Sequence, residues 1–524
     1  MKRRTFIQST ALFGSVLTLP FPEIMRSAPP LPAESGRLIE DAVSAAMDEG
    51  AEYAEALFIT ERNRNMQVRK NALHGVHDGE EAGLLLRVRI HGSWGAVAVP
   101  VHRLGELRPA ARQACAFARI AVNPGGEAPV LAERLRGGGG SWKPEGVTDP
   151  FLVNPEEKVE FLKDLTARAL KITQIPYAVS NLFDRKRVTS FINSHGTRTE
   201  QQRFISYVNF AVTAFHQQKR RMDTRSSERE ARMTDWNGAT QGMQSELETA
   251  MQEVLRRQQA KPVEAASYDM VIHPSLLWYL LRETLLPHLD IRRILGRDGL
   301  APADRWVSVE DIGTKRMGSD ALQLRADATL QGGLASIGWD DSGRVASQRD
   351  LISGGVLQCV PVSDEIYGAH HATVSPPQGQ HAYPFSLAAA WNTAPGLAMP
   401  NIVMKEGPGK HLNALIGSVD KGLFVKGRAT VIMNEAKTLF RVRPQAAWMI
   451  RSGAIGDMVS DVEIETSVEA FWNSLREVGR SEDTFHGGDL FPMSSFPLWD
   501  TPFTVATPPA LFSAVPVYRV EDRS

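Results

Sequence analysis

The segment that decides the fold lies at residues 268–296, in the middle of the chain, and reads YDMVIHPSLLWYLLRETLLPHLDIRRILG. The residues around its start, 265–273, have the composition of a strand. The apolar run that follows Pro274 predicts a helix from Ser275 to about residue 286. Pro287 comes next, and a proline ring is able to break a helix at this point. The segment therefore predicts a strand that leads directly into an apolar helix.

The sequence that follows this segment has a different character. Residues 306–515 consist of short runs of strand composition separated by turns, and one helix is expected over 468–478. Repeated short strands with hairpin turns favour a barrel or a sandwich. We therefore predict a C-terminal domain over 263–524 that is predominantly β and barrel-like. Its turn signals are Asp341-Ser342-Gly343, Ser353-Gly354-Gly355 and Arg451-Ser452-Gly453.

The sequence before the segment, 34–262, mixes helices and strands. The Pro- and Gly-rich stretch 123–156 is typical of a linker or long surface loop. The stretch 219–232 mixes Arg and Lys with acidic residues, which favours a solvated strand end or loop. We predict an α+β domain of α/β-sandwich type. Its expected helices are 36–49, 104–121, 155–173 and 245–259; its expected strands are 53–60, 65–70, 82–90, 94–99, 177–182, 188–193 and 205–215, with turns at Asp78-Gly79 and His91-Gly92.

The first residues, 1–33, have the features of an export signal. They begin MKRRTFIQSTALFGSVLTLP, where Arg3 and Arg4 precede Thr5, Phe6 and Ile7 in the manner of a twin-arginine signal. The apolar run over 6–19 is too short to span a bilayer as a mature helix. We therefore expect a periplasmic protein that crosses the membrane already folded and has no integral membrane span.

Composition narrows the partners of this chain of 524 residues. Its 59 Lys and Arg balance 60 Asp and Glu, so no charge excess indicates a nucleic acid or a membrane surface. Cys115 and Cys359 are the only cysteines, which is too few for a disulfide framework. We expect both thiols to be buried apolar side chains.

Residues 268–296 are similar to the helix that carries the H-E-x-x-x-H motif of the TldD/PmbA metallopeptidase family, also called the modulator-of-DNA-gyrase family. The resemblance extends over almost all of the mature chain, and it implies an N-terminal α+β domain, a C-terminal barrel-like domain and a metal helix near their junction. The other stretches that resemble the family are 80–99, 333–360, 399–407, 418–427 and 467–479.

The family's metal site is the point at which this chain departs from the resemblance. In active members two His of the helix and a C-terminal Cys would bind zinc, and the Glu beside the first His would activate the metal-bound water. Here the first His position is Arg282, the Glu is kept as Glu283 and the second His position is Pro287. No Cys follows Cys359, and 490–493 lie nearest to its expected place.

These replacements remove the side chains that hold zinc. Arginine stays protonated and repels a cation, and proline has no side-chain donor. We therefore expect no metal, and Glu283 loses its role as general base. His288 faces elsewhere unless the helix breaks at Pro287, since each residue turns a helix by about 100°. With such a break, a rebuilt zinc site could combine His288 with Asp290, His486 or Asp489.

Three hypotheses about function follow. The first is a non-catalytic subunit that binds peptides and forms a homo- or heterodimer with a TldD/PmbA-family chain, because the family is understood to pair a metal-bearing subunit with a ligand-free one. The second is an active zinc metallopeptidase with a relocated site around Glu283 and His288. The third is a homodimeric peptide-binding or scaffold protein. Peptide specificity and stoichiometry are not encoded in any motif of this sequence.

Overall fold

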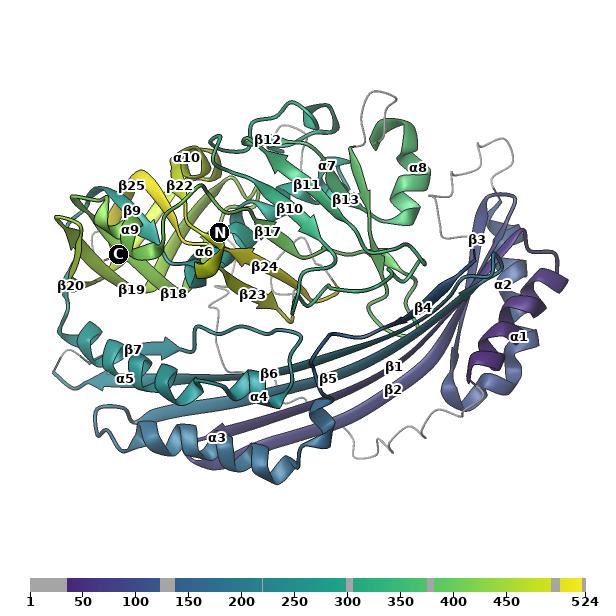
Figure 1. The fold of residues 1–524 in the computed structure, drawn as a ribbon, viewed down its shortest axis with the longest axis horizontal. Helices are drawn as coiled ribbons and strands as arrows, with labels where there is room; N and C mark the ends of the chain where they lie inside the picture. Colours follow the sequence, from purple (N-terminus) through teal and green to yellow (C-terminus); the bar gives the residue numbers. More distant parts are fainter. Residues whose placement is uncertain are drawn as a thin grey trace, which may run out of the picture.

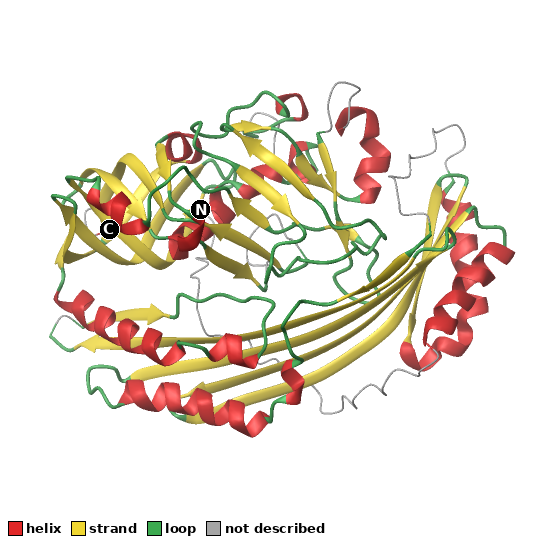
Figure 2. Cartoon of the chain, in the orientation of Figure 1, coloured by secondary structure: helices red, strands yellow, loops and turns green. Residues whose placement is uncertain are grey.

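A computed structural model describes residues 35–122, 137–218, 220–297, 305–374, 381–491 and 500–520. The predicted signal segment 1–33 lies outside these residues. A long curved sheet runs beneath a second part that contains all the later strands (Figure 1). Strands dominate both parts, and the long helices lie along the outer face of the curved sheet (Figure 2). Within the described ranges, no helix combines the length and the apolar character needed to cross a membrane.

The first sheet is built from unusually long antiparallel strands. Its order is β3-β2-β1-β5-β6-β4, and β7 pairs with the far end of β6. Because β1 and β2 form one hairpin and β5 and β6 another, most of the pairing is between neighbours in sequence. The strands are β1 (Tyr53–Arg69), β2 (Ala72–Ile90), β3 (Ser93–Pro100), β4 (Gly139–Trp142), β5 (Tyr177–Asn193), β6 (Arg198–His216) and β7 (Arg221–Ser226).

The predicted turn at Asp78-Gly79 is wrong. Asp78 lies inside β2, where its carboxylate accepts hydrogen bonds from Arg62 at 3.0 Å and from Arg64 at 2.7 Å, both on β1. The hairpin instead turns at Lys70 and Asn71, which have φ values of 47° and 64°. These cross-strand ion pairs override the local turn signal. The predicted strands 53–60 and 65–70 are therefore one strand, β1. The predicted strands 177–182 and 188–193 likewise form a single strand, β5.

Helices cover the outer face of this sheet in two groups. At one end α1 (Ser35–Asp48) and α2 (Leu107–Ala121) pack against Ala54 and Phe58 of β1. At the other end α3 (Pro155–Leu170) packs against β1 and β5, and α5 (Met243–Gln259) packs against β6 and β7 (Figure 1). Since side chains alternate along a strand, Leu57 and Ile59 face the opposite way, toward Ala388 of the second part. The short α4 (Trp236–Thr240) precedes α5.

The second part contains a closed barrel of five strands. Each of β18, β9, β25, β21 and β19 pairs with the next, and β19 pairs back with β18. The predicted α+β class and the barrel-like C-terminal domain are thereby confirmed. The barrel strands are β9 (Ala266–Ile272), β18 (Lys421–Met433), β19 (Leu439–Arg451), β21 (Val462–Ser467) and β25 (Ala510–Arg519), and β8 (Lys261–Pro262), β20 (Ala454–Ser460) and β22 (Leu475–Val478) extend the sheet.

A six-stranded sheet lies beside the barrel, in the order β12-β11-β10-β17-β24-β23. Two small pairs of strands, β13 with β14 and β15 with β16, complete the β structure that the described residues form here. The strands of this region are β10 (Leu324–Asp327), β11 (Gln348–Ser353), β12 (Val356–Leu357), β13 (Val360–Val362), β14 (Ala382–Pro384), β15 (Ser386–Leu387), β16 (Gly396–Leu397), β17 (Ile402–Met404), β23 (Phe485–Asp489) and β24 (Phe503–Thr507). The helices are α6 (Pro274–Thr284), α7 (Ile291–Ile294), α8 (Asp364–Val374), α9 (Leu412–Gly417) and α10 (Val468–Asn473).

Three further expectations need correction. The predicted helix 468–478 ends at Asn473, and its remainder forms β22, which pairs with β25. The predicted loop 123–156 contains β4, which pairs with β6. The stretch 219–232 is solvated only in part, because Met222 on β7 is exposed whereas Arg225 is only 2% exposed and is held by ion pairs. The mixed charges of this stretch belong to a buried junction between the two parts.

One half of that junction is centred on Lys426 of β18. The Lys426 ammonium lies 2.7 Å from Glu253 of α5 and 3.1 Å from Glu228, and Arg225 of β7 also pairs with both carboxylates. Burial would raise the pKa of Glu228, but Arg225 and Lys426 lower it to about 2. Two cations shared between two carboxylates satisfy every charge, so these ion pairs join the barrel to the first sheet. Gly427, with φ of 81°, forms a bulge beside them.

The other half of the junction is centred on Arg428, two residues further along β18. Its guanidinium donates at 2.8 Å to Glu230 and at 2.7 Å to the hydroxyl of Tyr207 on β6, which itself donates to Glu230 at 3.1 Å. Burial, together with Asp489 and Glu246 nearby, raises the pKa of Glu230 to about 7 against the pull of Arg428. Glu230 has one cationic partner, and this difference explains why its pKa shifts in the opposite direction to that of Glu228.

The bulge at Gly427 predicts that one added methyl group at this position would destabilise the fold. A Cβ at Gly427 would overlap the Arg225 guanidinium, and a positive φ disfavours any other residue. We expect Gly427→Ala to lower the free energy of unfolding by about 2 kcal/mol or more, measured by denaturant unfolding. Gly417→Ala is the control, since no atom lies within 4 Å of a Cβ there and its change should be near zero. Equal stability of the two variants would contradict this account of the bulge.

The raised pKa of Glu230 predicts a pH dependence. Because its pKa in the folded chain is about 7, above the ordinary 4.5, folding takes up a proton between these values, and stability falls as pH rises from about 5 to about 7. Glu230→Gln should lose this contribution, so its stability relative to the parent chain should improve as pH rises. Parallel pH profiles of the unfolding free energy for the two proteins would show that Glu230 does not titrate in this range.

Candidate functional site

The helix of the quoted segment, α6, lies between the two sheets of the second part. It packs against β18 of the barrel on one side and against β23 and β24 on the other. Pro274 stands in its first turn, and the ring of His273 accepts a hydrogen bond from the Ser275 amide. All of its residues except the half-buried Tyr279 are buried. A helix that is apolar on every side fits only inside a core, and this is the position it occupies.

The C-terminal end of α6 carries the residues at the family's motif positions. Arg282 is 2% exposed, and its Nε and Nη2 each lie 2.7 Å from Oδ2 of Asp489 on β23. Its Nη1 donates to the neighbouring Glu283. Burial would lower the pKa of Arg282, but the two carboxylates raise it above its usual value. A buried guanidinium therefore occupies the helix end, with one carboxylate on each side.

Asp489 is the neighbour that spacing arguments did not connect to Arg282. The two residues are 207 positions apart, and β23 brings them together. Burial raises the pKa of Asp489, and Arg282 opposes this shift. The region where the resemblance places a third metal ligand, 490–493, begins directly after Asp489, and its residues 492 and 493 lie outside the described ranges. β23 thus brings the residue just before the expected stretch to the helix, and its side chain is a carboxylate bound to Arg282.

The helix does end before Pro287, as a rebuilt site would require. The α-helical part stops at Thr284, and a single 3-10 turn, Leu286–Leu289, contains Pro287 and His288. The His288 ring is buried, its Nε2 donates to the backbone carbonyl of Lys437 at 3.0 Å, and its ring centroid lies 4.8 Å from that of Trp306. Burial lowers the pKa of His288 to about 3, so the ring is neutral. Its contacts are those of a core histidine.

Of the other proposed ligands, Asp290 is engaged by its own neighbours, whereas His486 is buried and its Nδ1 makes no hydrogen bond with the described residues. Asp290 caps α7 by accepting a hydrogen bond from the Arg292 amide at 2.8 Å, and it pairs with the Arg292 side chain at 2.6 Å. His486 lies on β23, where burial lowers its pKa to about 4. Across the described part of the chain, no three His, Cys, Asp or Glu side chains gather as a metal site would require. The residues present do not fit a zinc ion.

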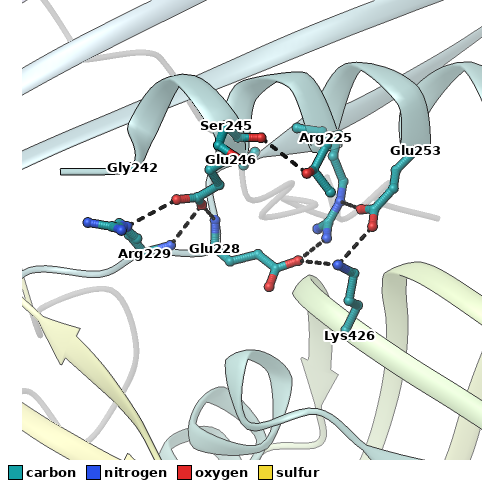
Figure 3. Close-up of a pocket in the computed structure, with 11 residues that line it drawn as sticks. Arg225, Glu228, Arg229, Gly242, Ser245, Glu246, Glu253 and Lys426 are labelled. Carbon is teal, nitrogen blue, oxygen red and sulfur yellow. Dashed lines mark hydrogen bonds and ion pairs between the residues drawn. The ribbon is translucent and has the colours of Figure 1, made fainter. Parts of the chain in front are cut away.

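A cavity of about 360 Å³ lies near the opposite, N-terminal end of the helix. Figure 3 shows Glu228 paired directly with Lys426 among the residues that line it. Three cations and three carboxylates line it, each paired, so the cavity has no net charge and no activated nucleophile. The only sign of this cavity in the sequence is the mixture of charges over 219–232. Its lining residues are Arg225, Ser226, Glu228, Arg229, Gly242, Ser245, Glu246, Thr249, Ala250, Glu253 and Lys426.

Comparison with known proteins places this arrangement in a family. The model of the PmbA/TldA metallopeptidase central domain matches residues 148–260, and that of the PmbA/TldA metallopeptidase C-terminal domain matches residues 265–517. A metalloprotease of Methanocaldococcus jannaschii is 22% identical over 429 residues, which is 80% of this chain and 88% of that protein. A metalloprotease of Synechocystis is 23% identical over 450 residues, 83% of this chain and 89% of its own length.

Solved structures share the same fold. A protein described as a putative modulator of DNA gyrase from Bacteroides thetaiotaomicron superposes with a TM-score of 0.68 at 21% identity, covering 93% of this chain and 99% of its own. TldE from Thermococcus kodakarensis superposes with a TM-score of 0.65 at 16% identity, covering 92% of this chain and 99% of its own. With the two family domains matched over most of its length, the chain belongs to the PmbA/TldD metallopeptidase family.

Proposed function

We propose that this chain is a non-catalytic member of its family, which binds peptides and pairs with a metal-bearing family chain. The observation that carries the proposal is the Arg282 guanidinium, buried between Glu283 and Asp489 at the end of α6. Catalytic zinc needs three protein ligands and an open position, and a fixed positive charge at the first ligand position opposes any cation there. Glu283, bound to Arg282, then has no metal-bound water to deprotonate.

The pairing with a second chain completes this proposal. A subunit that retains the family fold without its metal ligands contributes to proteolysis by holding the substrate or by shaping the site of another subunit. The substrate would be unfolded peptide, held largely by backbone hydrogen bonds to a strand edge. The twin-arginine sequence around Arg3 and Arg4 supports export, and such a route would allow both chains to reach the periplasm folded and already assembled.

The absence of a catalytic metal is the first prediction of this proposal. We expect the purified chain to contain no stoichiometric zinc and to cleave no unfolded casein or peptide library, because its ligand positions hold Arg282 and Pro287. Elemental analysis and a peptidase assay, before and after dialysis against zinc, measure both properties. His288→Ala serves as the second sample. Stoichiometric zinc in the parent chain that disappears in this variant would establish the relocated metallopeptidase instead.

Pairing is the second prediction. An affinity-tagged chain, recovered from the periplasmic fraction of its native host, should bring with it a family member that carries the H-E-x-x-x-H histidines and the C-terminal cysteine. Peptidase activity of the recovered complex should depend on the zinc of the partner and should be unchanged by Glu283→Gln in this chain. Recovery of self-associated chains alone would exclude the heteromeric subunit and leave the homodimeric peptide-binding or scaffold protein.

A further inference from the structure

The place at which the family would hold a metal ion contains a positive charge that belongs to this chain. Arg282 projects from α6, and its side chain is 2% exposed. It reaches Asp489 on β23 through two nitrogens and Glu283 through a third. A divalent ion held by a helix and a distant strand would make the same kind of link between carboxylates. Because these residues do not fit zinc, the guanidinium at this position needs a different explanation.

The burial of the two carboxylates supplies the answer. The side chain of Glu283 is 8% exposed and that of Asp489 is 12% exposed, so neither charge is solvated well by water. Two uncompensated carboxylates that close together would repel one another and carry a large desolvation cost. Arg282 neutralises one charge directly and gives each carboxylate a charge-assisted hydrogen bond. Without Arg282, the repulsion and desolvation of the two carboxylates would favour separation of β23 from α6.

We infer that Arg282 is a built-in cation that holds β23 against α6, in the structural role that a ligand-bound metal ion would otherwise have. The chemistry of arginine suits this role better than that of lysine. Its planar fork donates in two directions at once, toward Asp489 and toward Glu283, whereas an ammonium is a single point of charge. Unlike a bound metal ion, the guanidinium is covalently part of α6, so its presence at this position does not depend on the concentration of metal in solution.

Among the described residues, Arg282 is the cation that contacts both carboxylates. Tyr279 lies one turn earlier on α6 and interacts electrostatically with Arg282, Glu283 and Asp489. Lys437 lies near Glu283, and burial lowers its pKa. Arg428 is bound to Glu230 and Tyr207 at the junction described above. This inference concerns the assembly of the fold around α6, and it holds whether or not the chain has a catalytic partner.

A comparison of two substitutions in the full chain tests the inference. Arg282→Met keeps most of the apolar stem but removes the charge, and Arg282→Lys keeps the charge but loses the fork. We expect the thermal midpoint at pH 8 to fall by on the order of 5–10 °C for Arg282→Met, and by distinctly less for Arg282→Lys. Arg316→Ala, which removes an exposed partner of Asp320, is the control and should change nothing.

The pH dependence separates a role of charge from a role of packing. In Arg282→Met, Asp489 should lose the interaction that opposes its burial-raised pKa, so stability is gained as pH falls and this carboxyl binds a proton. The difference in midpoint between the parent chain and Arg282→Met should therefore shrink between pH 8 and pH 5. A pH-independent difference, or equal losses in the Met and Lys variants, would overturn the inference in favour of simple packing.

A chemical rescue provides a second readout if either variant folds poorly. Arg282→Ala leaves room for a free guanidinium ion, and low millimolar guanidinium chloride should raise its thermal midpoint, whereas the same concentration of sodium chloride should not. Absence of rescue together with pH-independent loss would overturn the inference. A chelator that lowers the midpoint of the parent chain would instead refute the proposed metal-free function, so the two failures are distinguishable.

Discussion

The enclosure of α6 is the constraint on which the rest of the second part depends. Its apolar surface on all sides requires a barrel on one flank and a sheet on the other, since neither alone would remove the helix from water. That enclosure also buries every polar group at the helix end. Arg282 and Glu283 can exist there only because β23 returns a third charge, Asp489, to complete the set. Apolar packing and charge pairing at this helix are therefore two parts of one requirement.

The junction with the first sheet follows the same rule. Lys426 and Arg428 stand on either side of a glycine bulge in β18, and each reaches a glutamate from the segment that follows β7. Lys426 and Arg428 find their counter-charges on the other part of the chain, while Arg225 pairs with the same carboxylates as Lys426 from its own side. The position of the long sheet over the barrel is thus specified by charge as well as by shape. The two glutamates differ in proton affinity because Glu228 has two cationic partners, whereas Glu230 has one and lies near the carboxylates of Asp489 and Glu246.

How much of this could be predicted from the sequence depends on the distance over which each interaction acts. The periodicity of 275–286 predicts α6 to within two residues of its end, and the short strands after residue 306 predict a β-rich domain. Local patterns fail where a remote partner decides. Asp78 and Gly79 have a turn signature, yet arginines of β1 hold them in a strand. Arg225 lies in a stretch whose composition is typical of the surface, yet it is buried beside Glu253 and Lys426. Likewise, nothing in the spacing links Arg282 to Asp489.

The pairing at residue 282 has a consequence for the history of such a chain. A single change of Arg282 to histidine would restore one ligand but leave two buried carboxylates beside a neutral ring, before any ion could bind. Residue 287 and a thiolate near residue 490 would have to change as well, and each alone gains nothing. If Arg282 holds β23 against α6 as inferred above, a chain with histidine at this position would lose that link before a metal ion could replace it.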